Sequence, residues 1–158
     1  MRPVTDLVIA GDDPRAPDVT ALLERHLAFT HETTPPEVVF ALDVDGLVDP
    51  AITFCSARRA GALLGVGALK ELDAAHGELK SMHTAATARG QGIGGAVVEH
   101  LVDLARRRGY ARVSLETGSQ DAFAPARALY ARCGFVPCGP FADYPDAPSS
   151  VFMTLALR

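Results

Sequence analysis

Apolar side chains recur at helical spacing over residues 93–108. One face of this segment carries Ile93, Ala96, Val97, His100, Leu101, Leu104 and Ala105. Such a stripe packs against a core while the opposite face stays in water. Gly109 follows, and glycine is the residue that most often ends a helix. The pattern predicts an amphipathic helix, which is the clearest element of the chain.

Two shorter patterns predict further helices. Asp18 can cap a helix whose apolar face carries Val19, Leu22, Leu23, His26 and Leu27. This helix should end within residues 33–36, because the two prolines there cannot donate a backbone hydrogen bond. Pro125 suits the first turn of a helix that runs to Cys133, and Gly134 is placed to end it.

Several short segments have the composition and alternation of strands. Ala60 and Gly61, between two of them, are typical of a hairpin turn. Residues 37–50 are ambiguous. The strand segments are residues 4–9, 52–58, 62–69, 79–84, 112–116, 135–136 and 151–157. Together with the helices, their order predicts an α/β chain that starts antiparallel and contains a crossover in its second half.

Length, charge and cysteine content narrow the function classes. A chain of 158 residues suits one domain. The net charge of -4 argues against nucleic-acid binding, and the basic run at residues 106–108 falls in the last turn of a helix, where cations complement the dipole. Three cysteines without framework spacing fit a reducing compartment, and no His cluster beside them suggests zinc. No run approaches the ~20 apolar residues of a membrane span, so we expect a cytoplasmic protein.

Glycines gather where the clearest helix begins. Gly92, Gly94 and Gly95 lie at its start, although each glycine in a helix costs roughly 1 kcal/mol relative to alanine. One explanation is the close approach of an anionic ligand to the free N–H groups of a helix N-terminus. The other is a loop that only turns tightly. Arg89 adds a cation beside the loop and favours the anion.

Two ligand classes fit this loop. Residues 90–95 satisfy G-x-G-x-x-G, and Glu116 follows at the distance of a ribose-binding carboxylate, which would indicate a nucleotide-dependent oxidoreductase. Residues 85–89, however, separate the loop from the preceding strand. That strand, residues 78–84, is half polar, unlike the buried parallel strand of a dinucleotide fold. In addition, a long segment with an apparent hairpin precedes Glu78.

The same residues read as Arg89-x-x-Gly92-x-Gly94 resemble the signature of the GNAT superfamily of N-acetyltransferases. Residues 126–135 resemble a second family motif, A-x-x-L-Y-x-x-x-G-F, in the expected order and spacing. Residues 114–118 and 139–144 are similar to a bacterial subgroup of uncharacterised acetyltransferases. The resemblance implies a GNAT-like α/β fold: a mixed, mostly antiparallel central sheet flanked by helices, in a single domain over residues 1–158.

The resemblance also implies acetyl-CoA as the acyl donor, with no metal. Backbone amides of the loop would hold its pyrophosphate, at Arg89, Gly90, Gln91, Gly92, Ile93, Gly94 and Gly95. The preceding strand is often bulged in the family, and the backbone of Met82, His83 and Thr84 would hold the pantetheine arm. One of these N–H groups would polarise the thioester carbonyl, a contribution of several kcal/mol in other enzymes.

In this family the acceptor amine attacks the thioester directly in a ternary complex, and two proton transfers need residues. An amine with a pKa near ~10 must lose a proton before it attacks. Glu78 and Glu116 are the candidate bases, and either could instead form a surface ion pair. Tyr130 occupies the position of the family's tyrosine, whose phenol supplies a proton to the departing CoA thiolate. It could also simply pack.

Other readings remain open. An acyl-cysteine route through Cys133 or Cys138 has no nearby histidine in its favour. His83 is an isolated histidine in the sequence, and its side chain could contact the acceptor or bind nothing. The aromatic segment at residues 141–144 could line the acceptor side or only cap the core. The acceptor is expected to be a small-molecule or peptide amine, and a homodimer is possible. The alternatives are a non-catalytic CoA-binding regulatory protein and the nucleotide-dependent oxidoreductase.

Overall fold

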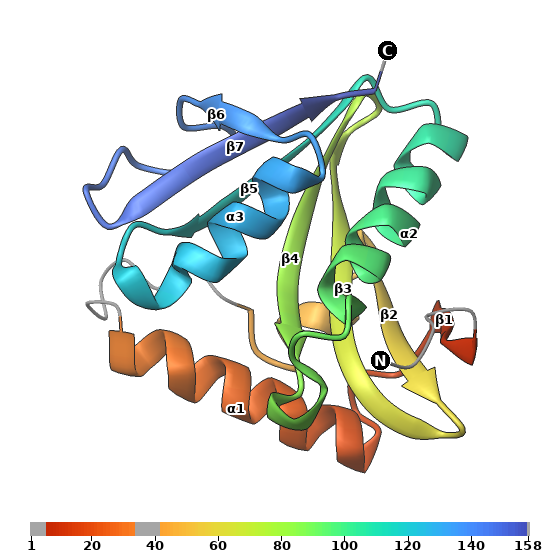
Figure 1. Cartoon of the computed structure of the whole chain (residues 1–158). Coiled ribbons are helices and arrows are strands. Elements are labelled where there is room, and N and C mark those ends of the chain that lie inside the picture. The colour runs from red at the N-terminus through yellow and green to blue at the C-terminus, as the bar shows by residue number, and fades with distance from the viewer. Residues whose placement is uncertain (1–5, 34–41, 158) are drawn as a thin grey trace.

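One sheet of seven strands, in the order β1-β2-β3-β4-β5-β7-β6, runs through the molecule (Figure 1). The structure is a computed structural model and describes residues 6–33 and 42–157. The strands are β1 (Val8–Gly11), β2 (Ile52–Arg59), β3 (Ala62–Asp73), β4 (His76–Thr84), β5 (Arg112–Gly118), β6 (Val136–Cys138) and β7 (Ser150–Ala156).

Only the β4–β5 pair is parallel, and the other five pairings are antiparallel. The helix α2 (Ile93–Arg107) forms the crossover between β4 and β5. The hairpin turn between β2 and β3 lies at Ala60 and Gly61, which have φ angles of 51° and 83°. The predicted mixed, mostly antiparallel sheet with a late crossover is therefore confirmed.

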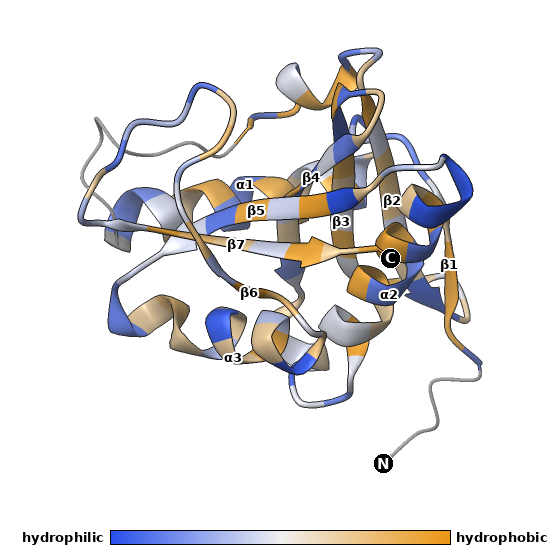
Figure 2. Cartoon of the chain, turned by 90° about the horizontal axis from the view of Figure 1, so that it is seen from above, coloured by the Kyte–Doolittle hydropathy of each residue, from blue (hydrophilic) through white to orange (hydrophobic). Residues whose placement is uncertain are grey.

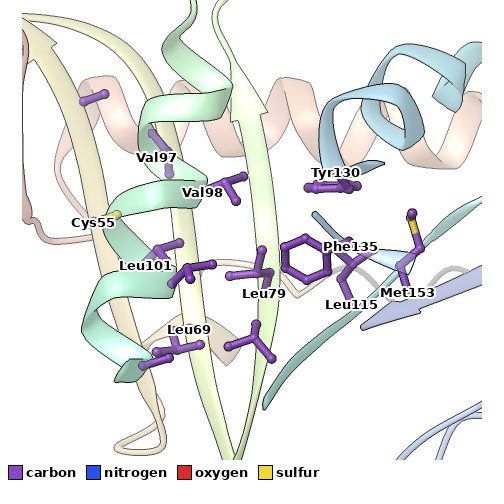
Figure 3. Packing of buried hydrophobic residues seen from close by; sticks show 14 of the residues in the cluster. Cys55, Leu69, Leu79, Val97, Val98, Leu101, Leu115, Tyr130, Phe135 and Met153 are labelled. Atoms are coloured by element: carbon purple, nitrogen blue, oxygen red, sulfur yellow. The ribbon is translucent and has the colours of Figure 1, made fainter. Parts of the chain in front are cut away.

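The helices cover both faces of the sheet (Figure 2). On one face, α1 (Pro17–Thr33) buries Val19, Leu22 and Leu23 against Phe54, Val66 and Ala68 of the strands. On the other face, α2 and α3 (Ala124–Arg132) pack in a second core cluster. The strand residues of this cluster alternate along the strands with those of the first. Figure 3 shows this second cluster, with Tyr130, Phe135, Leu115 and Met153 gathered at its β5 side.

The helix predicted over residues 93–108 is confirmed and ends one residue earlier, at Arg107. The first helix begins at Pro17, so Asp18 lies in its first turn and not at the N-cap. Proline favours this first helical position because it has no N–H to leave unpaired. The predicted end of α1 within residues 33–36 falls mostly outside the described residues.

The strand predictions differ from the structure mainly at their ends. The first strand was expected at residues 4–9 and is observed at Val8–Gly11, although residues 4 and 5 lie outside the described part. β4 begins at His76, three residues before its predicted start. The ambiguous segment contains a short 3-10 helix, Gly46–Val48. Within residues 6–33 and 42–157, no helix has the length and apolar character needed to cross a membrane.

Candidate active site

β4 and β5 pair only along their first halves. The last paired residues are Leu79 and Leu115, although β4 continues to Thr84 and β5 to Gly118. Figure 1 shows the two strands diverging beyond this point. The edge of β4 that faces β5 is therefore left without a partner strand among the described residues, and its backbone groups can bind a ligand.

A β-bulge lies in β4 at the point of divergence. Val66 of β3 pairs with His83 and Ala68 pairs with Lys80, so two residues of β4 lie opposite one of β3. Ser81, one of the two, has a φ of 57°. A non-glycine residue in this region is strained, and such strain is found most often at functional sites. The bulge expected from the family resemblance is present.

One cavity of about 500 Å³ occupies the gap between the two strands. It is bounded by β4, β5, α1, α3 and the glycine loop, which we define as residues 89–95. The cavity brings together every predicted site residue except Gln91. These residues are Glu78, Met82, His83, Thr84, Arg89, Gly90, Gly92, Ile93, Gly94, Gly95, Glu116 and Tyr130. The side chain of Gln91 accepts a hydrogen bond from Arg59 at 3.0 Å instead.

The glycine loop presents the N-terminus of α2 to this cavity. Gly92 is the N-cap residue, with a φ of 80°, and Gly90 has a φ of 78°. Both conformations are ordinary only for glycine. The first turn of α2 contains no acidic residue, and Arg89 is exposed beside it. Free N–H groups, the helix dipole and a cation therefore converge on one point, which suits a pyrophosphate.

Gly94 has a second, structural reason to be glycine. A Cβ atom at this position would lie 2.9 Å from Cδ2 of Leu129 in α3. Its absence lets α2 and α3 approach closely beside the cavity. The glycines of the loop therefore serve helix packing as well as access to a ligand, a distinction that the sequence pattern does not reveal.

Glu78 is the centre of a buried polar cluster. Its carboxylate, on a side chain 3% exposed, accepts a hydrogen bond from the Tyr144 hydroxyl and one from Lys80 Nζ at 3.2 Å. Lys80 Nζ also donates to the Tyr144 hydroxyl oxygen at 2.8 Å. Burial is the main cause that raises the pKa of Tyr144, and the charge of Glu78 is the second. The negative charge of Glu78 is therefore compensated by two donors, one of them a cation.

Glu116 lies on the neighbouring strand in a different environment. The Ser150 hydroxyl donates to its Oε2 at 2.8 Å. Burial raises the pKa of Glu116 above its ordinary value, and the charge of Glu78 adds to this. The hydrogen bond from Ser150 and the charge of Lys80 oppose the shift without cancelling it. Burial therefore raises the proton affinity of the Glu116 carboxylate.

Tyr130 is 7% exposed and packs edge-on against Phe135 at 6.0 Å between ring centroids. Burial raises the pKa of Tyr130, with smaller contributions from Cys133 and Glu116. Its hydroxyl has no hydrogen-bond partner within residues 6–33 and 42–157. The ring therefore packs in the core, while the residue also lines the cavity with a phenol that remains available as a donor.

His83 is not isolated, contrary to what its sequence context indicates. Its Nδ1 atom lies 3.2 Å from Nδ1 of His26 in α1, and both residues line the cavity. Burial lowers the pKa of each histidine to about 4. The charge of His83 also lowers the pKa of His26, and the charges of Arg89 and Arg25 also lower the pKa of His83. Both rings are therefore neutral at physiological pH.

Sequence reasoning did not predict His26 or Lys80 as cavity residues, and it named Tyr144 only within an aromatic segment that could line the acceptor side. His26 meets a partner 57 positions away, and Tyr144 meets partners 64 and 66 positions away. The only available signal was the aromatic segment at residues 141–144. Its Tyr144 lines the cavity, whereas Phe141 is buried against Phe152.

The cysteines do not line this cavity. Burial raises the pKa of Cys133 and Cys138, and it raises that of Cys55 to about 12. A raised thiol pKa disfavours the thiolate that an acyl-cysteine route requires. Among the residues that the structure describes, no group of three or more His, Cys, Asp or Glu side chains could hold a metal ion.

Comparison with known proteins gives consistent matches. Residues 17–135 match the acetyltransferase (GNAT) family. The chain is 48% identical over 146 residues to the uncharacterized N-acetyltransferase YsnE of Bacillus subtilis, covering 92% of this chain and 97% of that protein. It is 43% identical over 149 residues to the uncharacterized N-acetyltransferase YedL of Escherichia coli, covering 94% of each. A crystal structure of a candidate acyl-CoA N-acyltransferase from Klebsiella pneumoniae superposes with a TM-score of 0.82 at 28% identity, covering 96% of this chain and 98% of that one.

Proposed function

Because the chain belongs to the acetyltransferase (GNAT) family, we propose that its cavity transfers an acetyl group from acetyl-CoA to an amine of a small molecule or peptide. The reaction is a direct attack within a ternary complex. The observation that carries this proposal is the single cavity that joins the N-terminus of α2 to Glu116 and Tyr130. A homodimer and a cytoplasmic location remain predictions.

Acetyl-CoA binding rests on two features of the cavity. The glycine loop supplies backbone N–H groups, and Arg89 supplies a cation, to the pyrophosphate. The unpaired edge of β4 at residues 82–84 supplies backbone groups to the pantetheine arm. One of these N–H groups donates to the thioester carbonyl oxygen and stabilises the negative charge that develops there.

Glu116 accepts the proton of the acceptor ammonium. A general base works best when its pKa lies near the operating pH, and burial moves the pKa of Glu116 in that direction. Glu78 is already held by Tyr144 and Lys80, so its carboxylate is less available. We therefore assign Glu116 as the base and Glu78 as a residue that positions Lys80 and Tyr144.

The neutral amine then forms the C–N bond as the C–S bond breaks. The electron pair of the broken bond passes to the CoA sulfur, and the Tyr130 hydroxyl donates its proton to that thiolate. The second proton of the amine nitrogen, which is lost as the amide forms, restores the phenol. The raised pKa of Tyr130 keeps the phenol protonated across the working range of pH. The donor is therefore present whenever the thiolate forms.

Release of the CoA thiol tests this proposal. The purified protein is mixed with acetyl-CoA and a panel of amines, and free thiol is followed with a chromogenic disulfide. Turnover on at least one amine is expected, with slower turnover for Glu116→Gln and Tyr130→Phe. The difference in turnover between Glu116→Gln and the unsubstituted protein should become smaller as the pH approaches the pKa of the amine, because a free amine needs no base. The difference for Tyr130→Phe should stay the same over this range of pH.

Three outcomes would contradict parts of this assignment. Binding of acetyl-CoA without thiol release on any amine would indicate a CoA-binding regulatory protein. Thermal stabilisation by NADH and none by CoA would favour the nucleotide-dependent oxidoreductase. If the loss of turnover became smaller with rising pH in Glu78→Gln and not in Glu116→Gln, Glu78 would be the base.

A further inference from the structure

We infer that the acceptor is a compact monocationic amine that carries no carboxylate of its own. The inference rests on the proposed function and names the substrate class of the same cavity. It follows from the charges on the α1 side of the cavity, from the apolar surfaces that close it, and from the room that the acyl donor leaves.

The side of the cavity next to α1 is the one that we assign to the acceptor. Three ionisable side chains line it: Glu78, Lys80 and Glu116. Glu78 and Lys80 form an ion pair at 3.2 Å, both with side chains at most 9% exposed. The Lys80 ammonium also lies over the ring of Tyr144, 5.4 Å from its centroid. This pair is internally balanced, so Glu116 is left as the unbalanced charge of the three, and within the described part of the chain its carboxylate is bonded only to the neutral Ser150 hydroxyl.

No other charged side chain among the described residues that line this side offsets Glu116, and Arg25 of α1, which acts on His83, does not line the cavity. The neighbouring His26–His83 pair is neutral at physiological pH. Arg89 and Arg132 also line the cavity, but they lie at the glycine loop and in the last turn of α3, on the acyl-donor side. An ammonium group beside Glu116 would neutralise the acceptor side, and the attraction between the two charges is strong where water is excluded.

A carboxylate on the acceptor would meet the opposite situation. Among the described residues that line this side of the cavity, Lys80 is the only cation, and it is already shared between Glu78 and Tyr144. A carboxylate beside Lys80 would therefore approach Glu78 and Glu116 as well. Like charges brought together in a buried site weaken binding, and such repulsion is a common source of specificity.

Apolar surfaces and limited space define the rest of the acceptor. Phe29 of α1 and Phe123, the last residue of the 3-10 helix Asp121–Phe123, make an edge contact at 5.2 Å between ring centroids. Both rings line the cavity, so its wall there suits a hydrocarbon or aryl body. The same cavity of about 500 Å³ must also hold the acetyl group and the pantetheine arm. The remaining space fits a small molecule better than a peptide.

Matched pairs of acceptors test this inference. Phenethylamine and phenylalanine differ only by the α-carboxylate, and phenylalaninamide keeps an α-substituent of similar size without the charge. The specificity constant (kcat/KM) is measured for each acceptor with saturating acetyl-CoA. We expect phenethylamine to exceed phenylalanine by about tenfold or more, which corresponds to about 1.4 kcal/mol. Phenylalaninamide should recover most of the difference.

The variant Lys80→Met separates two explanations of any preference. It retains a long apolar side chain and removes the cation, and its fold is checked by thermal denaturation. Under our inference it still prefers phenethylamine. If Lys80 instead binds an acceptor carboxylate, the unsubstituted protein prefers phenylalanine and Lys80→Met loses that preference, which would overturn the inference.

The failures of the two proposals are distinguishable. Equal or greater kcat/KM for phenylalanine, or turnover confined to peptides, would overturn the acceptor class and leave acetyl transfer intact. If none of the amines in the panel gave thiol release, the proposed function would be overturned, and the acceptor class with it. Thermal shift in the presence of CoA provides a second readout, in which monoamines should stabilise the complex and amino acids should not.

Discussion

At the residue scale, the catalytic role proposed for Glu116 is accompanied by a cost to folding. Its pKa is raised in the folded protein, so the ionised form is disfavoured by folding. The folded state is therefore penalised above the raised pKa, and the penalty disappears as the pH falls below the ordinary value of 4.5. A carboxylate that is easily protonated by a substrate is also one that destabilises its own fold at neutral pH.

Glu116→Gln is expected to raise the stability of the ligand-free protein at neutral pH. The neutral amide keeps an acceptor for the Ser150 hydroxyl and removes the desolvated charge. The gain should be of the order of 1 kcal/mol and should vanish near pH 4, where Glu116 is protonated. Chemical denaturation at the two pH values measures it. An equal gain at both would show that packing, and not charge, is responsible.

Ser81 provides a second test at this scale. Its hydroxyl is buried and has no hydrogen-bond partner among the described residues, and the residue lines the cavity at the bulge. An unsatisfied buried hydroxyl destabilises by about 1–3 kcal/mol, so Ser81→Ala should leave the ligand-free protein equally or more stable. If a bound ligand supplies the partner, the same variant should bind acetyl-CoA or the acceptor less tightly in calorimetry.

The matched control for Ser81 is Ser114→Ala. The Ser114 hydroxyl lies 2.6 Å from His76 Nε2 and 2.9 Å from Thr154 Oγ1. Its removal should therefore lower the free energy of unfolding by about 1 kcal/mol. Equal losses in the two variants would mean that the Ser81 hydroxyl is already satisfied in the free protein.

At the element scale, the sequence predicts what is periodic and local. The stripe along α2 predicted that helix to within one residue, because its burial follows the helical repeat. The family motifs placed the glycine loop and Tyr130 in one site. The contacts of Tyr144 with Glu78 and Lys80 could not be predicted, because they depend on how the chain between β6 and β7 folds back over the sheet.

The glycine loop can be tested by one substitution at the N-terminus of α2. Gly92→Glu should abolish acetyl-CoA binding, because its carboxylate would project into the cavity at the point assigned to the pyrophosphate. The substitution also strains the backbone, since Gly92 has a φ of 80°. Isothermal titration with acetyl-CoA and thermal denaturation of the free protein measure the two effects separately.

Gly109→Glu is a matched control for the strain alone. Gly109 has a φ of 79°, with no atom within 4 Å of an added Cβ, and it does not line the cavity. Both variants should lose a similar, modest stability of about 1 kcal/mol. Only Gly92→Glu should lose acetyl-CoA binding. Retained affinity in that variant would contradict the assignment of the loop.

At the scale of the whole molecule, α1 connects the stability of the fold to the proposed acceptor side of the cavity. It packs on the sheet face opposite α2 and α3 (Figure 2). It is tied to β2 by an ion pair of 2.7 Å between Asp18 and Arg58, and to β4 by the contact between His26 and His83. Residues of α1 also form one wall of the cavity. Conditions that loosen this helix should therefore act on the acceptor side as well.

The His26–His83 pair makes that connection sensitive to pH. Both pKa values are lowered from 6.5 to about 4 in the folded protein. The pair therefore stabilises fully above pH 6.5, and its contribution is lost as the pH falls from 6.5 towards 4. The loss should amount to about 1–3 kcal/mol for each histidine. The lowered pKa of Asp12 and Asp18 acts below their ordinary 3.8, in a separate range of pH.

Replacing both histidines should flatten this dependence. In His26→Asn/His83→Asn, the two amides can still hydrogen-bond at the Nδ1 positions but do not titrate, so the free energy of unfolding should change much less between about pH 6.5 and pH 4.5. Urea denaturation at these values measures the difference against the unsubstituted protein. His31→Asn, at an exposed position of the same helix, should keep the original slope. If the double variant retained the full loss, other groups would govern the acid sensitivity, and His76 and His100, whose pKa values are also lowered by burial, would be the next to replace.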